Sequence, residues 1–265
     1  MSSASGVPTL TLVGGPTALI TYGGLRILTD PTFDPPGRYE SSSSPVILTK
    51  LDGPAVDAAD IGPIDVVLLS HDHHADNLDA GGRAVLAQTG RVVTTGAGAE
   101  RLGAGAAGLE PGDALDLDLP GGGTLNITAV PADHGPPEVA AVNGPVIGFV
   151  LRADGLPAVY VSGDNASVDV VRDVVREHGP FDVAVLFAGA AQVPERWGED
   201  APLTLTPEAA IEAAVELAPA AIIPIHQDGW AHFTADGGDL EAAFSDAGLG
   251  GRLRRVLPGE TIDLS

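Results

Sequence analysis

The stretch from Ser70 to Leu78 reads Ser-His-Asp-His-His-Ala-Asp-Asn-Leu, and it decides how the rest of the chain is interpreted. It holds three of the chain's seven histidines together with two aspartates. The apolar run Val66–Leu69 precedes it and has the composition of a buried strand. Imidazole nitrogens and carboxylate oxygens held at about 2.0–2.2 Å are the ligands that a divalent metal ion requires. The stretch therefore predicts a metal site where a strand passes into a loop.

Charge and composition limit the partners that such a site could serve. The 265-residue chain has 13 Lys and Arg against 36 Asp and Glu, and a formal net charge of −23. A field of that sign repels phosphate backbones and anionic lipid, so we expect a small-molecule substrate, no nucleic acid and no membrane. The chain has no cysteine. Any metal ligand must therefore come from His, Asp or Glu.

The ends and connectors predict one cytoplasmic domain over residues 1–265. The segment Met1–Pro8 lacks the basic start and apolar core of a signal peptide. No apolar run reaches the roughly 20 residues that span a bilayer. No Gly/Ser-rich or charged linker divides the chain.

Apolar periodicity predicts a layered α/β sandwich. Short β-rich runs separated by glycines come first, at 9–13, 17–22 and 25–29. A Pro- and Ser-rich loop is expected over 34–45. The second half alternates between strands and helices, with strands at 158–162, 183–187 and 222–225 and helices at 168–178, 206–217 and 240–247. Two last strands are expected at 254–256 and 261–264.

Isolated His and Asp residues follow several other predicted strands. They are Asp30, His134, Asp164 and His226. A single Asp before a turn is usually a turn or cap residue, and a single His is usually structural. Taken together with the cluster, their repeated place at strand ends predicts one shared site, because loops at strand ends carry sites on rigid scaffolds.

These blocks together resemble the metallo-β-lactamase superfamily of metal-dependent hydrolases, in particular the branch of L-ascorbate-6-phosphate lactonase. The segment Leu25–Pro31 resembles that branch's opening strand pair, and Leu69–His73 resembles its first metal motif. The next three motifs of that branch are matched by residues 129–134, Ser162–Asp164 and Pro224–His226, which resemble them in order. The resemblance implies a four-layer αββα sandwich of metallo-β-lactamase type and a hydrolase of a lactone, ester or amide.

The resemblance also implies the ligands. His71, His134 and one or both of His73 and His74 would hold one ion, and Asp76 and His226 a second, with Asp164 bridging. Zn²⁺ is the first expectation and Mn²⁺ or Fe²⁺ the alternatives, with one or two ions bound. A metal-activated water would attack the substrate. Asp76 could orient that water or act as general base, and His232 is a second catalytic candidate.

Two departures from the family pattern motivate alternatives. The first motif is one residue too long, so it can be aligned from His71 and His73 or from Asp72 and His74, and Asn77 replaces its last histidine. Gly15 stands where many members of the branch have His. A degenerate protein that binds a ligand without hydrolysis is therefore one alternative, and a phosphodiesterase is another. A homo-oligomer also stays open.

Aromatic and basic residues near the motifs could shape a pocket. Trp197 and Trp230 either pack at loop bases or face the site. Arg38 and Tyr39, in the expected loop, are the candidates for reaching an anionic substrate.

Overall fold

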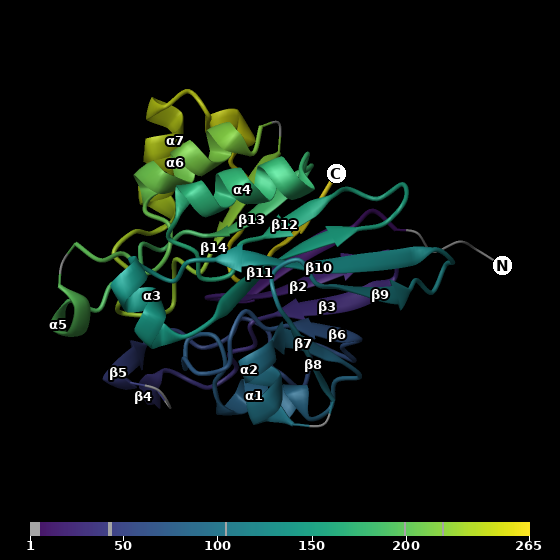
Figure 1. Cartoon of the computed structure of the whole chain (residues 1–265), viewed down its shortest axis with the longest axis horizontal. Helices are drawn as coiled ribbons and strands as arrows, with labels where there is room; N and C mark the ends of the chain where they lie inside the picture. Colours follow the sequence, from purple (N-terminus) through teal and green to yellow (C-terminus); the bar gives the residue numbers. More distant parts are fainter. Residues whose placement is uncertain (1–5, 42–43, 104, 199, 219) are drawn as a thin grey trace.

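Two β-sheets packed face to face form the body of the protein (Figure 1). The computed structural model describes residues 6–41, 44–103, 105–198, 200–218 and 220–265. The first sheet contains, in spatial order, β15 (Thr261–Asp263), β1 (Thr9–Gly14), β2 (Thr17–Tyr22), β3 (Leu25–Thr29), β6 (Val66–Leu68), β7 (Val92–Thr95) and β8 (Ala106–Leu109). The second contains β14 (Ala221–Ile225), β13 (Val183–Phe187), β12 (Val159–Val161), β11 (Val146–Arg152), β10 (Thr124–Ala132) and β9 (Ala114–Asp118).

The main core lies between these sheets. Strands of the first sheet contribute Leu12, Ile20 and Ile27, and those of the second contribute Phe149 and Val185, all of them almost completely buried. The strand β13, which lies between β14 and β12, is buried along its whole length because it is covered on both faces. This explains its continuous apolar sequence, which is typical of parallel strands inside a sandwich.

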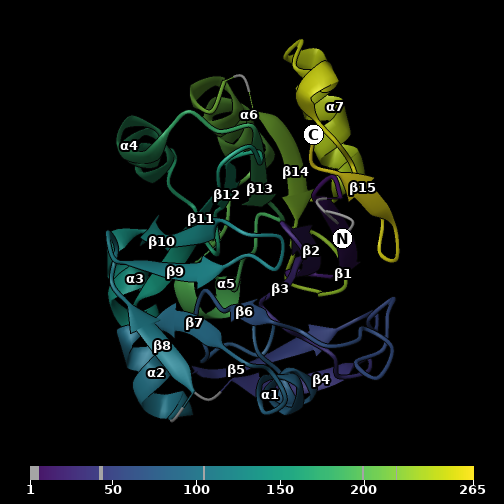
Figure 2. The same ribbon diagram turned by 90° about the vertical axis from the view of Figure 1, so that its right-hand side faces the viewer.

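Helices complete the outer layers (Figure 2). The outer face of the second sheet packs against α4 (Val168–His178), α6 (Pro207–Glu216) and α7 (Gly237–Asp246). The first sheet is covered by α1 (Ala80–Leu86) and α2 (Gly96–Leu102) together with the 54–64 connector. This arrangement is the expected αββα sandwich. None of the helices in the described ranges is long and apolar enough to cross a membrane.

The α4 helix shows why the sequence prediction succeeded in the second half. It spans Val168–His178, as its periodicity predicts, and it buries Val171 and Val174 against the sheet. The Ser167 side chain accepts a hydrogen bond from Val170 N and caps the first turn.

Residues 34–50 differ from the prediction. Instead of the loop expected over 34–45, β4 (Gly37–Ser41) and β5 (Ser44–Lys50) pair as an antiparallel two-stranded sheet. Lys50 anchors this sheet to the body, since its Nζ donates to Asp79 Oδ2 at 3.2 Å. The strand expected at 254–256 is also absent from the described residues, where η1 (Gly250–Arg252) is followed by irregular backbone.

Strand direction collects the predicted residues at one edge of the sandwich. The carboxyl ends of the parallel strands β3 and β6 meet there, as do those of β12, β13 and β14. β10 runs in the same direction as β12, because each is antiparallel to β11. Two short helices, α3 (Pro137–Asn143) and α5 (Pro194–Trp197), lie at this end, near the β4–β5 sheet (Figure 1).

Candidate metal centre

The loop after β6 brings two of its three histidines together. His71 Nε2 lies 2.9 Å from His74 Nδ1, and His71 is fully buried. The ring of His73 packs against both of these rings, with centroids 4.7 Å from His71 and 4.5 Å from His74, while its Nδ1 lies 3.9 Å from Asp72 Oδ1. Asp72 in turn accepts a 2.9 Å hydrogen bond from Arg101 Nε. The sequence allowed two alignments of the motif, one with His71 and His73 as its pair and one with Asp72 and His74. The structure instead brings His71 and His74 together, so it follows neither alignment.

The described residues contain two groups that could hold a metal ion, and Asp164 belongs to both. The histidine group consists of His71, His74, His134 and Asp164. His134 Nε2 lies 3.2 Å from His74 Nδ1 and 3.6 Å from Asp164 Oδ2. In each group the ligand atoms all lie within 4.8 Å of one another. His73 is in neither group.

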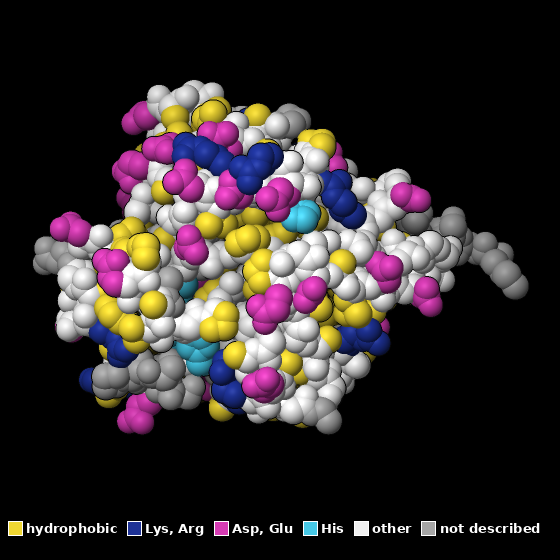
Figure 3. Space-filling model, viewed as in Figure 1, with side chains coloured by type: hydrophobic (Ala, Val, Ile, Leu, Met, Phe, Trp, Pro, Cys, Tyr) yellow, Lys and Arg dark blue, Asp and Glu magenta, His cyan; other side chains and the backbone are white. Residues whose placement is uncertain are grey.

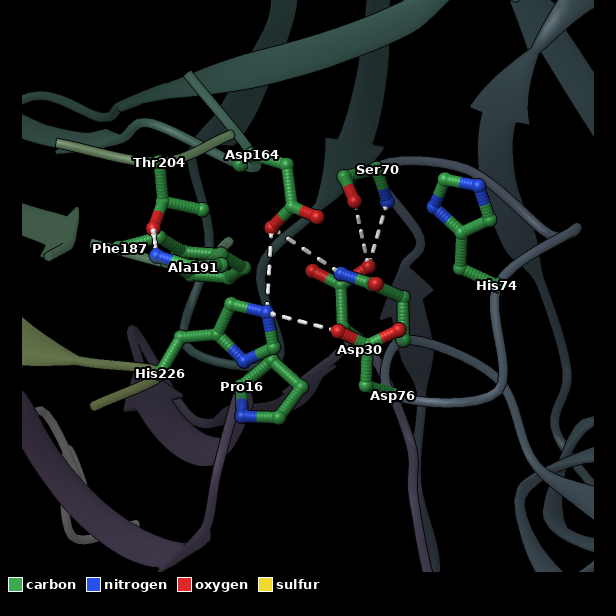
Figure 4. Close-up of polar contacts among 12 residues, drawn as sticks. Pro16, Asp30, Ser70, His74, Asp76, Asp164, Phe187, Ala191, Thr204 and His226 are labelled. Atoms are coloured by element: carbon green, nitrogen blue, oxygen red, sulfur yellow. Dashed lines mark hydrogen bonds and ion pairs between the residues drawn. The ribbon is translucent and has the colours of Figure 1, made fainter. Parts of the chain in front are cut away.

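The carboxylate group consists of Asp76, Asp164 and His226 (Figure 4). His226 Nε2 lies 3.4 Å from Asp164 Oδ1 and 3.5 Å from Asp76 Oδ2. His226 has a φ of +56°, a backbone conformation that costs free energy for a non-glycine residue. The surrounding structure therefore holds its ring toward the two carboxylates. Asn77 donates to Asp164 Oδ1 from Nδ2, at 3.3 Å.

Hydrogen bonds behind the histidine group set the direction of two rings. His134 Nδ1 lies 2.8 Å from the carbonyl oxygen of Leu203, which can only accept, so Nδ1 carries the proton and Nε2 presents its lone pair to the group. Ser70 Oγ lies 2.9 Å from His71 Nδ1 and 2.7 Å from Asp30 Oδ1. Burial raises the pKa of Asp30 well above its usual value, but Oδ1 also accepts from Ser70 N at 2.9 Å and is therefore the accepting oxygen. The Ser70 hydroxyl thus donates to Asp30 and accepts from His71, which leaves His71 Nε2 unprotonated as well.

Sequence comparison fits this geometry. Residues 25–227 match a family described as the beta-lactamase superfamily domain. The chain belongs to this superfamily. An uncharacterised protein of Mycobacterium tuberculosis is 27% identical over 223 residues, which are 80% of this chain and 56% of that protein. The chain thus spans about half the length of that relative. A metal-dependent hydrolase of Pelotomaculum thermopropionicum is 27% identical over 210 residues, 76% of this chain and 82% of that protein.

Solved structures with the same fold have different chemistry. An isothiocyanate hydrolase from Delia radicum gut bacteria matches with a TM-score of 0.80 at 20% identity, covering 96% of this chain and 98% of that one. CmlA, a diiron β-hydroxylase from Streptomyces venezuelae, matches with a TM-score of 0.67 at 18% identity, covering 97% and 54%. These matches show the metallo-β-lactamase fold, and they do not select a reaction. The resemblance to the lactonase branch stays a prediction.

The surroundings of the site in this superfamily member shift the pKa values of its residues in different directions. Burial and the neighbouring imidazoles lower the pKa of His71 and of His74 well below the usual value, so both favour the neutral form that binds metal. Burial alone would raise the pKa of Asp76, but nearby His226 and His232 hold it well below its usual range. Burial would likewise lower the pKa of His226, but Asp164 and Asp76 raise it.

The donor atoms of both groups suit a divalent cation. Asp76 Oδ1, Asn77 Oδ1 and both ring nitrogens of His226 are buried without a hydrogen-bond partner among the described residues. Buried polar atoms normally have a partner, and an ion would provide one to several of these atoms at once. Three imidazole nitrogens and a shared carboxylate also form a ligand set that Zn²⁺, Mn²⁺ and Fe²⁺ can all accept. The residues therefore fit the metal that the family implies.

The remaining candidates divide between site and surface. His232 reaches the site, with Nε2 3.0 Å from Asp76 Oδ2. Trp197 lines a cavity beside the site, whereas Trp230 is buried and meets Tyr39 edge-on at a ring separation of 6.1 Å. Arg38 is exposed on β4.

Sequence reasoning missed the supporting partners Arg101 and Leu203. An arginine in a helix gave no signal for the first, and the second acts through its backbone carbonyl, which any residue type would supply.

Proposed function

We propose that the chain is a metal-dependent hydrolase of a small molecule with a lactone, ester or amide bond. The observation that supports this most directly is the convergence of His71, His74 and His134 on Asp164, which also lies beside His226. The histidine group would hold one ion and the carboxylate group a second, with Asp164 shared. Zn²⁺ is the first expectation, followed by Mn²⁺ and Fe²⁺. Such an ion supplies Lewis-acid chemistry, polarising the electrophile and lowering the pKa of water towards about 7.

Asp76 and His232 would act together as the proton acceptor of the reaction. His232 lines the cavity beside the site, and its Nε2 lies 3.0 Å from Asp76 Oδ2. An ionised Asp76 selects the tautomer with the proton on Nε2, so His232 Nδ1 is left as an acceptor. Nδ1 has no hydrogen-bond partner among the described residues. His232 can thus accept a proton at Nδ1 while Asp76 stabilises the resulting imidazolium, as in a carboxylate–histidine pair.

Metal analysis combined with an activity panel tests the proposal. The metal-free protein is loaded separately with Zn²⁺, Mn²⁺ or Fe²⁺, its metal content is measured, and hydrolysis of a lactone, an ester and an amide is followed. We expect bound metal at or above one equivalent, activity that a chelator abolishes, and recovery on adding the ion back. A folded protein that binds none of the three ions would overturn it.

The same panel separates the hydrolase from a protein that only binds. Asn77 and Gly15 motivate that alternative, because each replaces a histidine of the family pattern. Metal bound with normal affinity, but with no turnover of any of the three bond types, would favour it.

A further inference from the structure

A small cavity opens directly on the candidate metal centre. Its volume is about 40 Å³, and His74, Asp76, His134 and His232 form its polar side. Its other walls include Val46, Leu48, Ala191, Val193, Trp197 and Leu203. In the space-filling view, histidine side chains are visible among hydrophobic ones near α3 and the β4–β5 sheet (Figure 3). A group bound in this cavity would therefore lie next to the reacting bond.

The apolar walls form a separate cluster that does not belong to the cores between the layers. It unites Leu48 of β5 with Ala191, Val193 and Leu203 of the segment after β13, and all four are buried. That segment is held in shape, since Ala191 N donates to Thr204 Oγ at 2.9 Å and Leu203 N to Ala191 O at 2.8 Å (Figure 4).

The same segment is tied to the site. The carbonyl oxygen of Leu203 accepts the hydrogen bond that orients His134. The wall and the histidine group therefore have a fixed relative position, and the cavity can discriminate by size.

The volume limits what can enter. One water needs roughly 10–15 Å³ of such space, so 40 Å³ accommodates about three atoms beside the site. An alkyl group of that size would contact the aliphatic walls, and each buried methylene would raise apparent affinity about fourfold. A longer chain would exceed this volume.

The lining of the cavity disfavours a charged group. Its aliphatic walls, Leu48, Ala191 and Val193, cannot solvate a carboxylate or a phosphate, and burying such a charge without a partner is unfavourable. Arg196 is the one Lys or Arg among the described lining residues, and its guanidinium stacks over the Trp197 ring at 4.6 Å.

We infer that this cavity binds a short, uncharged aliphatic group of the substrate, about three carbons long, adjacent to the bond that is cleaved. The inference rests on the proposed hydrolase function and specifies its substrate class. It separates this chain from a hydrolase of phosphorylated sugars, whose substrates would need several cationic or hydrogen-bond donors at this position.

An ester series with a constant leaving group tests the assignment. The metal-loaded protein is given 4-nitrophenyl acetate, butyrate and octanoate, and the 4-nitrophenyl monoester of succinate, which matches butyrate in length but is anionic. We expect kcat/KM for butyrate to exceed that for acetate by about 16-fold, since two methylenes are added at about fourfold each. The octanoate and succinate esters should fall at least tenfold below butyrate.

Two cavity variants sharpen the test. Val193→Phe fills the cavity and should remove the preference for butyrate over acetate, whereas Val46→Ala enlarges it and should move the optimum to a longer chain. Val215→Phe is the control, because Val215 is 57% exposed on the distant helix α6. Metal content is measured for each variant, and the rise in melting temperature with free butyrate, octanoate or succinate gives a readout independent of turnover.

The outcomes distinguish the two claims. Hydrolysis that ignores chain length, prefers the octanoate or succinate ester, or is unchanged by Val193→Phe overturns the cavity assignment and leaves the hydrolase intact. No hydrolysis of these esters or of the lactone and amide of the activity panel, but selective stabilisation by butyrate that Val193→Phe abolishes, supports the cavity and overturns the hydrolase. Neither hydrolysis nor selective stabilisation overturns both.

Discussion

The two ligand groups differ in how their donors are held. In the histidine group, the outer nitrogens of two rings have partners, Ser70 Oγ for His71 and the Leu203 carbonyl for His134. In the carboxylate group, His226 Nδ1 has no hydrogen-bond partner among the described residues. Partners behind a ligand fix its tautomer and raise its basicity. We therefore expect the two positions to be unequal, with a tightly bound ion in the histidine group and a more weakly bound one in the carboxylate group.

Removing the shared carboxylate should have the largest effect. Asp164→Asn keeps the side chain's shape but removes the charge that both groups use. We expect the content of both ions to fall and hydrolysis to drop by about 10³-fold, which corresponds to a loss of several kcal/mol of charge stabilisation. Metal analysis and kcat/KM measure this. Asp133→Asn, an exposed neighbour of His134, is the matched control. Retention of both ions in Asp164→Asn would show that the groups do not share it.

Single ligand removals separate the two positions. His71→Ala should abolish the tight ion, whereas His226→Ala should keep it and lose only the weaker one. Titration with a metal-indicator chelator reports how many ions remain and how tightly each is bound. His178→Ala, at the end of α4, is the control histidine. If His226→Ala instead abolished the tight ion and His71→Ala only the weaker one, hydrogen bonds behind the rings would not determine which position binds metal more tightly.

Ser70→Ala tests the support itself. It removes the hydroxyl that joins Asp30 to His71 and leaves Asp30 with the bond from Ser70 N, 2.9 Å long. Losing such a partner weakens metal binding by roughly 10–100-fold. The weaker position is the internal control, because its affinity should not change. Equal weakening at both positions would instead indicate a general loss of structure, which a lowered melting temperature would reveal.

Much of the fold could be predicted because it depends on local periodicity. The α4 helix and the strand β13 have the bounds expected from their apolar patterns. The β4–β5 sheet was missed because its stability comes from distant contacts. Lys50 binds Asp79 and lies 5.4 Å from the Trp230 ring centroid, and neither partner is near it in sequence.

The candidate site, like the fold, could be predicted only in part. Strand-end positions pointed to Asp164 and His226, which the structure brings together. The sequence could not choose between His73 and His74, because the course of the loop depends on the ion pair between Asp72 and Arg101, 29 residues apart. The residue spacing of a motif predicts the course of a loop only when no distant contact of this kind changes that course.

Placing a histidine at position 77, where the family pattern has one, should have the smallest effect. It tests most directly whether the two metal positions differ in affinity. Asn77 is fully buried, and its Nδ2 donates to Asp164 Oδ1 at 3.3 Å, so position 77 adjoins the carboxylate group. Asn77→His would replace a weakly basic amide with an imidazole and should tighten the weaker ion about tenfold, a gain of about 1.4 kcal/mol. The larger ring should lower the stability of the metal-free protein by roughly 1–3 kcal/mol, measured by denaturant unfolding. Asn77→Gln crowds the position without adding an imidazole and is the matched control. If both variants weaken the second ion equally, position 77 does not contribute a ligand, and the weakness of the carboxylate group has to come from His226.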